Sequence, residues 1–386
     1  MQTLKKTLIT GGGSGGHISV ASGLIQALKN KDYELYRNLV YVGGDLGMVG
    51  EKYGNSLEQR RFKDADFKTR YIRAGKLQRH LSLSTIKLFF RTILGLFDSL
   101  KILKGEKPDL IFSSGGFVSV PVCIAGWMKG IPIYLHEQTA TAGLANRIIG
   151  KFAKRIYLAF DSSKKYFNKN KTLLVGNIVR DSITKFNKER VSEEIKSLIL
   201  NNDNYPLIYI SGGGLGSHLL NTKILDEIDT ISSKYKVILQ TGNNQEFKDY
   251  EKALKEREVL DDDKRSRFLP IKFIDDNSIG YVYHNMDLFL GRAGANTVYE
   301  IGVLTKPSIF IPIPWVTNNE QYENAKVLKD LGLAEIVEEK ELKNLTLAEE
   351  IEKNIKKLPK ESLNYSLLKD KFPTNAVEKV LNDMYT

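Results

Sequence analysis

The chain has 386 residues, of which 42% are hydrophobic and 27% charged, a composition that excludes long disorder and a fibrous class. Its one cysteine, Cys123, excludes an internal disulfide and a thiolate metal cage and fits a reducing compartment. The net charge of +11 is uneven, because residues 1–176 carry 28 Lys and Arg against 12 Asp and Glu, whereas the remainder is net −5. This asymmetry predicts an anionic partner for the first half.

The first predicted strand runs straight into glycines, since residues 7–19 read TLITGGGSGGHIS. Apolar residues follow at helical spacing, which predicts a helix directly after the glycines. Glycines at a strand-to-helix turn let a ligand approach the backbone, and the N–H groups of the first helical turn favour an oxyanion. The sequence therefore predicts a phosphate site at this turn.

Strand-like runs alternate with helical stretches, which predicts parallel sheets flanked by helices. In the first half the runs lie at 6–10, 39–42, 71–74, 109–114, 131–137 and 155–160. The pattern pauses over 172–182 and restarts with runs at 207–214, 236–241, 271–276, 287–292 and 307–314. Each set opens on a glycine cluster, GGGSGG in the first and GGGLGS in the second.

We therefore predict an α/β protein of two doubly wound, Rossmann-like domains, covering 1–176 and 177–367. Ligands bind at the carboxyl ends of the strands in such sheets, so the two domains are expected to face each other across a cleft. A C-terminal helix over about 368–386 is expected to pack back on the first domain.

Two common classes of site fit poorly. Gly11, Gly13 and Gly16 satisfy the dinucleotide pattern G-x-G-x-x-G. A dehydrogenase is nevertheless disfavoured, because Asp45 lies behind two further glycines and His17 would project where a pyrophosphate should lie. The five histidines never pair at i, i+3 or i, i+4, so no metal site is expected.

A second small-residue turn follows the strand at 287–292, where Ala293, Gly294 and Ala295 precede a helix. Glu300 in that helix can accept both hydroxyls of a ribose, and residues 271–276 can offer backbone groups to a base. Gln321 and Asn324, at i, i+3, suit sugar hydroxyls, which need donors and acceptors together. These features together predict a site for a nucleotide diphosphate sugar.

In these features the chain resembles the MurG family of glycosyltransferases. The matching segments, in order, are GGGSGGH, SSGGFVSVP, HEQTATAGLAN, GNIVR, GGGLGS, FIDD, GRAGANTVYE and EQYENA. The resemblance covers almost the whole chain and implies a GT-B type fold, with no cofactor and no obligatory metal. It implies an inverting transfer of N-acetylglucosamine from UDP-N-acetylglucosamine to the C4 hydroxyl of undecaprenyl-pyrophosphoryl-N-acetylmuramyl-pentapeptide, in peptidoglycan synthesis.

The resemblance also implies particular site residues. On the donor side, Glu300 is the ribose ligand, Ile274 the backbone partner of uracil, and Gln321 and Asn324 the binders of the sugar. Further donor-side residues are Arg180, Gly213, Gly214, Asn221, Arg292, Ala293, Gly294 and Ala295. On the acceptor side the family pattern implies Gly13, Ser14, Gly15, Gly16, Gly115, Gly116 and Asn146, with His17 and Glu137 as candidate catalytic residues.

The sequence leaves open which side chain is the general base. His17 has an unshifted pKa of about 6.5, which suits proton transfer near neutrality, or it holds the glycine turn through a hydrogen bond. Glu137 is the rival base and His136 a third candidate. Gly214, Leu215, Thr139 and Glu320 depart from the family pattern, which leaves details of substrate contact open.

A lipid-linked acceptor implies that the protein acts at a membrane surface. We expect no membrane-spanning segment, because no apolar run reaches the roughly 18 residues that span a bilayer. We likewise expect no signal peptide, because no apolar core of one is present. Residues 81–104 place apolar side chains at helical spacing among basic ones, which predicts an interfacial helix. The expected location is the cytoplasmic face of the inner membrane. The predicted membrane edge comprises Arg79, Ile86, Phe89, Phe90, Arg91, Ile93 and Phe97.

Two other functions remain as alternatives. A UDP-N-acetylglucosamine 2-epimerase, or a GT-B transferase with a soluble acceptor, keeps the donor site and needs no apolar, basic acceptor side. A nucleic-acid-binding protein would use the basic half, but no basic stripe interleaved with stacking aromatics supports it, so no nucleic-acid partner is expected. The expected partners are UDP-N-acetylglucosamine, the lipid-linked acceptor, an anionic membrane surface and, as candidates, other proteins of cell-wall synthesis.

Overall fold

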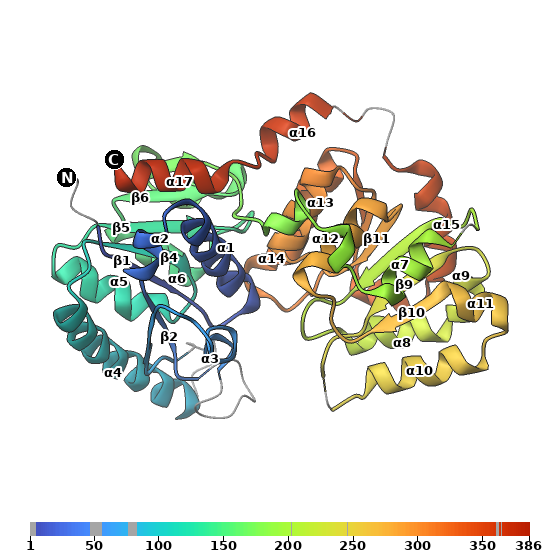
Figure 1. Ribbon diagram of the computed structural model, residues 1–386, viewed down its shortest axis with the longest axis horizontal. Coiled ribbons are helices and arrows are strands. Elements are labelled where there is room, and N and C mark those ends of the chain that lie inside the picture. Colours follow the sequence, from blue (N-terminus) through green and yellow to red (C-terminus); the bar gives the residue numbers. More distant parts are fainter. Residues whose placement is uncertain are drawn as a thin grey trace. The chain divides into compact units, whose positions relative to one another are not determined.

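The computed structural model describes residues 5–46, 56–75, 83–201, 203–244, 246–359, 363 and 365–386, with the side chains of the helix at 83–106 described from Phe90 onward. The chain divides into two compact units (Figure 1). Unit 1 comprises the residues up to Val179 together with Pro373–Thr386, and unit 2 comprises Arg180–Phe372. The first change of unit lies three residues after the predicted boundary.

Unit 1 is built on a seven-stranded sheet of order β3-β2-β1-β4-β5-β6-β7, and all its pairings are parallel. The strands are β1 (Thr7–Gly11), β2 (Val40–Gly44), β3 (Lys68–Ile72), β4 (Leu110–Gly115), β5 (Ile133–Glu137), β6 (Arg155–Leu158) and β7 (Thr172–Leu174). The helices are α1 (Gly15–Lys31), α2 (Tyr33–Arg37), α3 (Leu57–Arg61), α4 (Leu83–Glu106), α5 (Ser119–Met128), α6 (Leu144–Phe152) and α17 (Ala376–Tyr385), with short 3₁₀ helices η1 (Asp161–Tyr166) and η2 (Lys169–Lys171). The prediction of a pause over 172–182 missed β7, a three-residue edge strand.

Both faces of this sheet are covered, because successive strand residues point to opposite sides. Ile9, Tyr41 and Phe112 pack with α1 and α17 on one face. Leu8 and Ile111 pack with α4, α5 and α6 on the other. Burial on both faces is why these strands read as continuous apolar runs in the sequence.

The C-terminal helix α17 belongs to the core of unit 1, where Val380 and Met384 are fully buried. The Tyr385 hydroxyl lies 2.6 Å from the Thr7 hydroxyl, and Arg155 donates to Asp383. The predicted return at about residue 368 is too early, because α16 (Tyr365–Lys371) belongs to unit 2.

Unit 2 has a six-stranded parallel sheet of order β10-β9-β8-β11-β12-β13. The strands are β8 (Leu207–Ser211), β9 (Lys236–Gln240), β10 (Phe268–Ile271), β11 (Leu288–Gly291), β12 (Ser308–Phe310) and β13 (Ala334–Ile336). The remaining helices are α7 (Glu193–Leu200), α8 (His218–Asp226), α9 (Ile228–Ser232), α10 (Asp249–Val259), α11 (Asp262–Arg267), α12 (Asp276–Asn285), α13 (Ala295–Leu304), α14 (Glu320–Asp330) and α15 (Leu347–Lys357), with 3₁₀ helices η3 (Asp181–Ile183), η4 (Lys188–Arg190), η5 (Thr317–Asn319) and η6 (Glu339–Lys343). The predicted strand at 271–276 is wrong, because β10 ends at Ile271 and the Asp275 carboxylate caps α12.

The strand order reverses at one place in each sheet, between β1 and β4 in unit 1 and between β8 and β11 in unit 2. Connections on the two sides of such a reversal run to opposite faces, which opens a crevice at the carboxyl ends of the two strands. All the predicted glycine turns follow one of these four strands. The sequence-based fold class, two Rossmann-like parallel-sheet units, is therefore confirmed.

Met384→Ala tests how much α17 contributes to unit 1. Removing this buried side chain should lower the free energy of unfolding by about 2–4 kcal/mol, because transfer and cavity terms add. The chain has two tryptophans, Trp127 in unit 1 and Trp315 in unit 2, so urea unfolding in a Trp315→Phe background reports on unit 1. The exposed Asn382→Ala on the same helix is the control, and equal unfolding curves for the two variants would contradict this packing.

Candidate functional site

Two glycine turns meet at the reversal point of unit 1. Gly13, Gly115 and Gly116 have positive φ angles of 78°, 94° and 88°. A Cβ on Gly116 would lie 2.1 Å from the Gly12 carbonyl oxygen, so this close approach of the two turns requires glycine. Gly12 also donates its N–H to the Gly115 carbonyl at 3.3 Å, which ties the turn after β1 to the turn after β4.

The floor of the first turn is a buried carboxylate. Glu58, in α3, accepts the Gly13 N–H at 2.6 Å, and the Tyr41 hydroxyl donates to the Gly11 carbonyl. The predicted contact of Gly13 with an acceptor is therefore not made through its N–H, which points into unit 1. No sequence motif singles out Glu58 as functional, although Ser56 and Gln59 form a capping box that fixes the start of α3.

The open part of the turn is at the start of α1. A Cβ built on Gly15 or Gly16 meets no described atom within 4 Å, and Ser14 is half-buried at the N-cap. Gly115 and Gly116 are buried, so they shape the turn from behind. Of the predicted acceptor residues, Ser14, Gly15 and Gly16 are thus the ones whose backbone borders open space.

His17 stands in the first turn of α1 and reaches two neighbouring strand ends. Its Nδ1 lies 2.8 Å from the Ser114 carbonyl oxygen and 2.6 Å from the amide nitrogen of Gln138. The half-buried imidazole therefore contacts both the turn after β4 and the residue after β5. Gln138 was not singled out from the sequence beyond its place in the HEQ segment.

Glu137 is buried at the end of β5 and accepts hydrogen bonds on both carboxylate oxygens. Thr139 donates its N–H and its hydroxyl to Oε1 at 2.9 and 2.7 Å, and Asn146 donates its amide to Oε2 at 2.9 Å. Burial raises the pKa of Glu137 to about 7, against these hydrogen bonds, which lower it. This enclosure favours an orienting role for Glu137 and places Asn146 behind it rather than at the surface.

His136 is fully buried, and burial lowers its pKa to about 4. Its Nε2 lies 3.2 Å from the Gly176 carbonyl oxygen. The third candidate base is therefore a neutral interior side chain at pH 7.

The reversal point of unit 2 has the same construction. The turn after β8 holds Gly213 and Gly214, and the turn after β11 holds Gly294 before α13. A Cβ on Gly213 or Gly214 meets no described atom within 4 Å, and one on Gly294 meets only the Thr297 hydroxyl at 3.9 Å. These positions border open space beside the N-termini of α8 and α13, where backbone N–H groups favour phosphate.

Glu300, in α13, is buried and paired with Arg180. The Arg180 Nε donates to Glu300 Oε1 at 2.8 Å, and its Nη1 donates to Asp276 at 3.2 Å. Burial raises the pKa of Glu300, while the charge of Arg180 lowers it. Oε2 of Glu300 is buried without a hydrogen-bond partner among the described residues, which leaves one acceptor for a ligand hydroxyl.

Several residues predicted to bind the donor make hydrogen bonds within unit 2 that hold the neighbouring turns in place. Asn221 donates to Thr241 and Asp249, and Asn324 donates to the carbonyl oxygen of Ala293; both amides are fully buried. Gln321 accepts the Ile313 N–H at 3.1 Å. The sequence identified the segments that carry these amides, and the hydrogen bonds described for them are to other residues of the chain.

Two further residues predicted on the donor side also make contacts within unit 2. Arg292 is buried among Ser217, the Ile311 carbonyl and Glu339, so its guanidinium is committed within unit 2. The Ile274 N–H donates to Gln240 Oε1 at 3.3 Å. Gln240, which the sequence did not single out, also donates to the Gly213 carbonyl at 3.3 Å and so links the turn after β8 to the segment after β10.

The predicted membrane edge is described only in part. Arg79 lies outside the described residues, as do the side chains of Ile86 and Phe89. Phe90 and Phe97 are 60% and 61% exposed, and Ile93 and Leu94 are exposed beside them on α4. Arg91 is not a free surface cation, because it donates to the Asp45 carboxylate at 2.7 and 2.9 Å.

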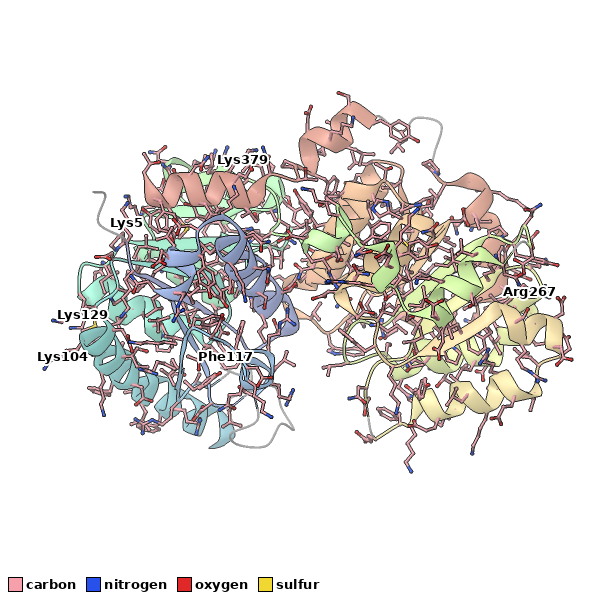
Figure 2. All side chains as sticks on the ribbon, viewed as in Figure 1. Lys5, Lys104, Phe117, Lys129, Arg267 and Lys379 are labelled. Carbon is pink, nitrogen blue, oxygen red and sulfur yellow. The ribbon has the colours of Figure 1, made fainter. Side chains whose placement is uncertain are left out.

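An aromatic residue that the sequence did not single out lies at the end of the neighbouring helix. Trp127 of α5 is 55% exposed, and its ring centroid lies 4.8 Å from that of Phe152. Helices α4 and α5 pack against each other, and Lys104 and Lys129, at their ends, are labelled in Figure 2. Exposed apolar and basic side chains thus share these two helices.

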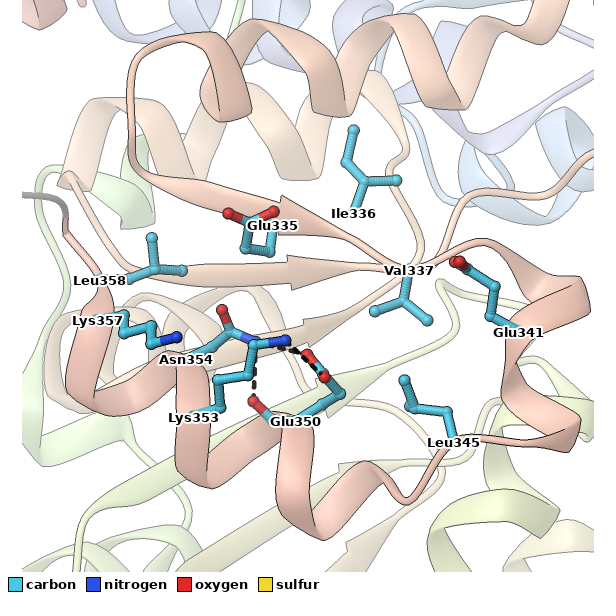
Figure 3. Close-up of a pocket in the computed structure, with 10 residues that line it drawn as sticks. All are labelled: Glu335, Ile336, Val337, Glu341, Leu345, Glu350, Lys353, Asn354, Lys357 and Leu358. Atoms are coloured by element: carbon cyan, nitrogen blue, oxygen red, sulfur yellow. Dashed lines mark hydrogen bonds and ion pairs between the residues drawn. The ribbon is translucent and has the colours of Figure 1, made fainter.

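A cavity of about 440 Å³ lies between β13 and α15 in unit 2 (Figure 3). Glu335, Ile336 and Val337 line it from the strand side, and Glu350 and Lys353 line it from α15. None of its ten lining residues is a predicted site residue. Among the residues that the structure describes, no group of three or more His, Cys, Asp or Glu side chains could hold a metal ion. None of the helices in that part of the chain has the length and apolarity needed to cross a membrane.

Comparisons with known proteins give the family. Residues 7–158 match the model of the glycosyltransferase family 28 N-terminal domain, and residues 207–380 match that of its C-terminal domain. UDP-N-acetylglucosamine–N-acetylmuramyl-(pentapeptide) pyrophosphoryl-undecaprenol N-acetylglucosamine transferases of two staphylococci are similar over nearly their whole length. The relative from Staphylococcus aureus MRSA252 is 33% identical, covering 91% of this chain and 90% of its own, and that from Staphylococcus carnosus TM300 is 34% identical, covering 98% of each. The chain belongs to the MurG family of glycosyltransferases.

Solved structures show how widely this family's fold is shared. The crystal structure of Acinetobacter baumannii MurG matches with a TM-score of 0.68 at 22% identity, covering 97% of each chain. A UDP-GlcNAc 2-epimerase from Neisseria meningitidis, bound to UDP-GlcNAc, matches with a TM-score of 0.64 at 13% identity, covering 98% of this chain and 99% of its own. At these identities the likeness concerns the fold, which MurG enzymes and epimerases have in common.

The raised pKa of Glu137 predicts a particular pH dependence of stability. The folded chain keeps a proton that the unfolded chain loses, so the free energy of unfolding from this group falls as pH rises from 4.5 to about 7 and is level above. The size of the fall is about 3 kcal/mol. Urea unfolding at pH 5, 6, 7 and 8, read by Trp127 in the Trp315→Phe background, should show this fall in the parent and lack it in Glu137→Gln. Parallel curves for the two proteins across that range would contradict the prediction.

Proposed function

We propose that this chain transfers N-acetylglucosamine from UDP-N-acetylglucosamine to the C4 hydroxyl of undecaprenyl-pyrophosphoryl-N-acetylmuramyl-pentapeptide. The observation that carries the proposal is the 33–34% identity, over at least nine-tenths of the chain, to enzymes named for this reaction. A pair of glycine-lined turns at the reversal point of each unit supports it, since the reaction brings together two substrates that each carry a diphosphate.

The donor binds unit 2 in this proposal. Its diphosphate lies along the open backbone of Gly213, Gly214 and Gly294, where the N-termini of α8 and α13 supply N–H groups and partial positive charge. Oε2 of Glu300, which has no hydrogen-bond partner among the described residues, accepts a ribose hydroxyl, and Arg180, paired with Oε1, favours the charged form of that carboxylate and lies near the departing phosphate.

The acceptor binds unit 1, with its pyrophosphate at the open start of α1 beside Gly15 and Gly16. Hydrogen on Nδ1 of His17, directed at the Ser114 carbonyl, leaves Nε2 as the basic nitrogen of the ring. His17 is therefore the preferred base, and Glu137 with Asn146 orients the loop after β5.

The reaction is an inverting displacement. The C4 oxygen of the acceptor attacks the anomeric carbon, its proton passes to His17, and the bond from that carbon to the β-phosphate oxygen breaks with its electron pair on UDP. Backbone dipoles and Arg180 offset the charge that develops on UDP, so we propose that no metal is obligatory. One missing donor of this kind typically raises the barrier by roughly 3 kcal/mol.

The assay that tests the proposal uses UDP-N-acetylglucosamine and a detergent-solubilised lipid-linked muramyl-pentapeptide, with and without EDTA. Disaccharide-lipid in both samples is expected. Formation of N-acetylmannosamine without the lipid product would instead favour a 2-epimerase, and loss of product in EDTA would contradict metal independence.

Glu300→Gln tests the donor site. The variant keeps the size of the side chain but loses a charged acceptor, so the KM for UDP-N-acetylglucosamine should rise at least about tenfold with little change in the KM for the acceptor. Steady-state kinetics with each substrate varied separately give both constants. Glu258→Gln, an exposed position of the same unit, is the matched control, and an unchanged donor KM in Glu300→Gln would refute the assignment.

We also propose that unit 1 works at the cytoplasmic face of the membrane. The proposed surface comprises Phe90, Phe97 and Trp127, together with Lys104 and Lys129 at the ends of α4 and α5. Exposed aromatic rings among lysines are suited to the interface of an anionic bilayer. Residues 90–171 hold 13 Lys and Arg against five Asp and Glu, which supports this choice of partner.

Phe97→Asp should weaken binding to vesicles that contain anionic lipid by about tenfold or more, because an exposed apolar ring is replaced by a charge of the wrong sign. In a Trp315→Phe background, Trp127 emission should shift to the blue on binding. Co-sedimentation measures the affinity, and Val259→Asp, at a 78% exposed position of unit 2, is the control. Equal binding by the two Asp variants would contradict the proposed surface.

A further inference from the structure

His17, in the first turn of α1, contacts Gln138, which directly follows β5, and His136 lies near the end of that strand. His17 Nδ1 is 2.6 Å from the Gln138 amide nitrogen. Burial lowers the pKa of His136, and the nearby Gln138 side chain acts on that pKa in the opposite direction. His136 in turn contacts the Gly176 carbonyl oxygen at 3.2 Å through Nε2. Gln138 is itself buried, so its polar atoms need partners within the protein.

The hydrogens on the two rings follow from their carbonyl contacts. A carbonyl oxygen only accepts, so His136 must carry its hydrogen on Nε2 and present a lone pair at Nδ1. By the same argument, the Ser114 carbonyl at 2.8 Å requires hydrogen on His17 Nδ1.

In this orientation of the amide, the donor end of Gln138 faces a donor and its acceptor end lacks a donor. Its nitrogen faces the Nδ1–H of His17, while Oε1 of Gln138 and Nδ1 of His136 are buried without hydrogen-bond partners. The oxygen and nitrogen of a glutamine amide are assigned from the hydrogen-bond network. Turning this amide over lets Oε1 share the Nδ1 hydrogen of His17 with the Ser114 carbonyl and lets the NH₂ group donate to Nδ1 of His136, so that each of these atoms gains a partner of the opposite kind.

We propose that Gln138 is a positioning residue that, hydrogen-bonded between His136 and His17, holds His17 in the Nδ1–H tautomer with Nε2 as its basic nitrogen. The chain of hydrogen bonds then begins at His17 and ends at the Gly176 carbonyl. The catalytic meaning of this arrangement rests on the proposed function, in which His17 takes the proton of the acceptor hydroxyl. The arrangement itself requires no substrate.

Other titratable groups lie close to His17, so the experiment must read the protonation of His17 separately from theirs. His136 is neutral near pH 7, Glu137 follows it on β5, and Glu58 lies beneath the turn that precedes α1. Since burial raises the pKa of Glu137 to about 7, a pH–rate profile would mix its titration with that of His17. Spectra of the imidazole nitrogens read His17 directly.

The experiment is a long-range ¹H–¹⁵N spectrum of the full chain labelled at histidine nitrogens, recorded from pH 5 to 9 without substrate. The chain has five histidines, and the signals lost in His17→Gln assign His17. The parent should show His17 as the Nδ1–H tautomer. Gln138→Met should lower the ratio of Nδ1–H to Nε2–H by about fivefold, the expected effect of one lost neutral hydrogen bond, and should lower the pKa of His17.

Gln138→Glu restores an acceptor and adds a charge, so the Nδ1–H tautomer should return and the pKa of His17 should rise by about one pH unit. Gln26→Met, the same exchange at an exposed position of α1, is the matched control, and urea unfolding read by Trp127 checks that the variants fold. A parent His17 in the Nε2–H tautomer, or a tautomer ratio unchanged by Gln138→Met, would overturn the proposal. A correct tautomer in a chain with no transferase activity would refute the proposed function and leave the role of Gln138 intact.

Discussion

The feature on which the structure depends is the reversal of strand order in each sheet, between β1 and β4 and between β8 and β11. At a reversal the helices leave on opposite faces, and the backbone at the carboxyl ends of the two strands is exposed to a ligand. Only glycine permits the approach of the turns there. A Cβ on Gly116 would meet Gly12 at 2.1 Å, and one on Gly291 would meet the Ser211 carbonyl oxygen at 2.1 Å.

A layer of buried polar side chains supports these turns from inside each unit. Glu58 and Gln138 act beneath the turns of unit 1, and Gln240 and Asn324 beneath those of unit 2. Burying such groups is unfavourable unless they are hydrogen-bonded, so each one fixes the conformation of the backbone that satisfies it. The open surface above the turns can then present N–H groups in one arrangement, as electrostatic stabilisation of a leaving diphosphate requires.

Much of the fold could be predicted from the sequence, because parallel strands buried on both faces read as apolar runs and the glycine clusters mark where two of them end. The edge strands β7 and β13 escaped prediction, since each has three residues and a weak pattern. Residues 271–276 resembled a strand, but Asp275 forms an N-cap that the local pattern did not reveal.

For the candidate site, sequence reasoning found the segments better than the directions of the side chains. Asn221, in α8, and Arg292, directly after β11, lie in the expected segments and bond inward, because tertiary contacts decide which way a polar side chain points. Glu58 and Trp127 carried no signal, one standing in a charged stretch and the other in an apolar one.

The proposed reaction requires the reversal point of unit 2 to hold the nucleotide diphosphate of the donor. A crystal structure determined with UDP present would show whether it does. We expect the diphosphate against Gly213, Gly214 and Gly294, with a ribose hydroxyl on Glu300. UDP bound instead against residues 11–16 of unit 1, with Glu300 still paired only to Arg180, would contradict it.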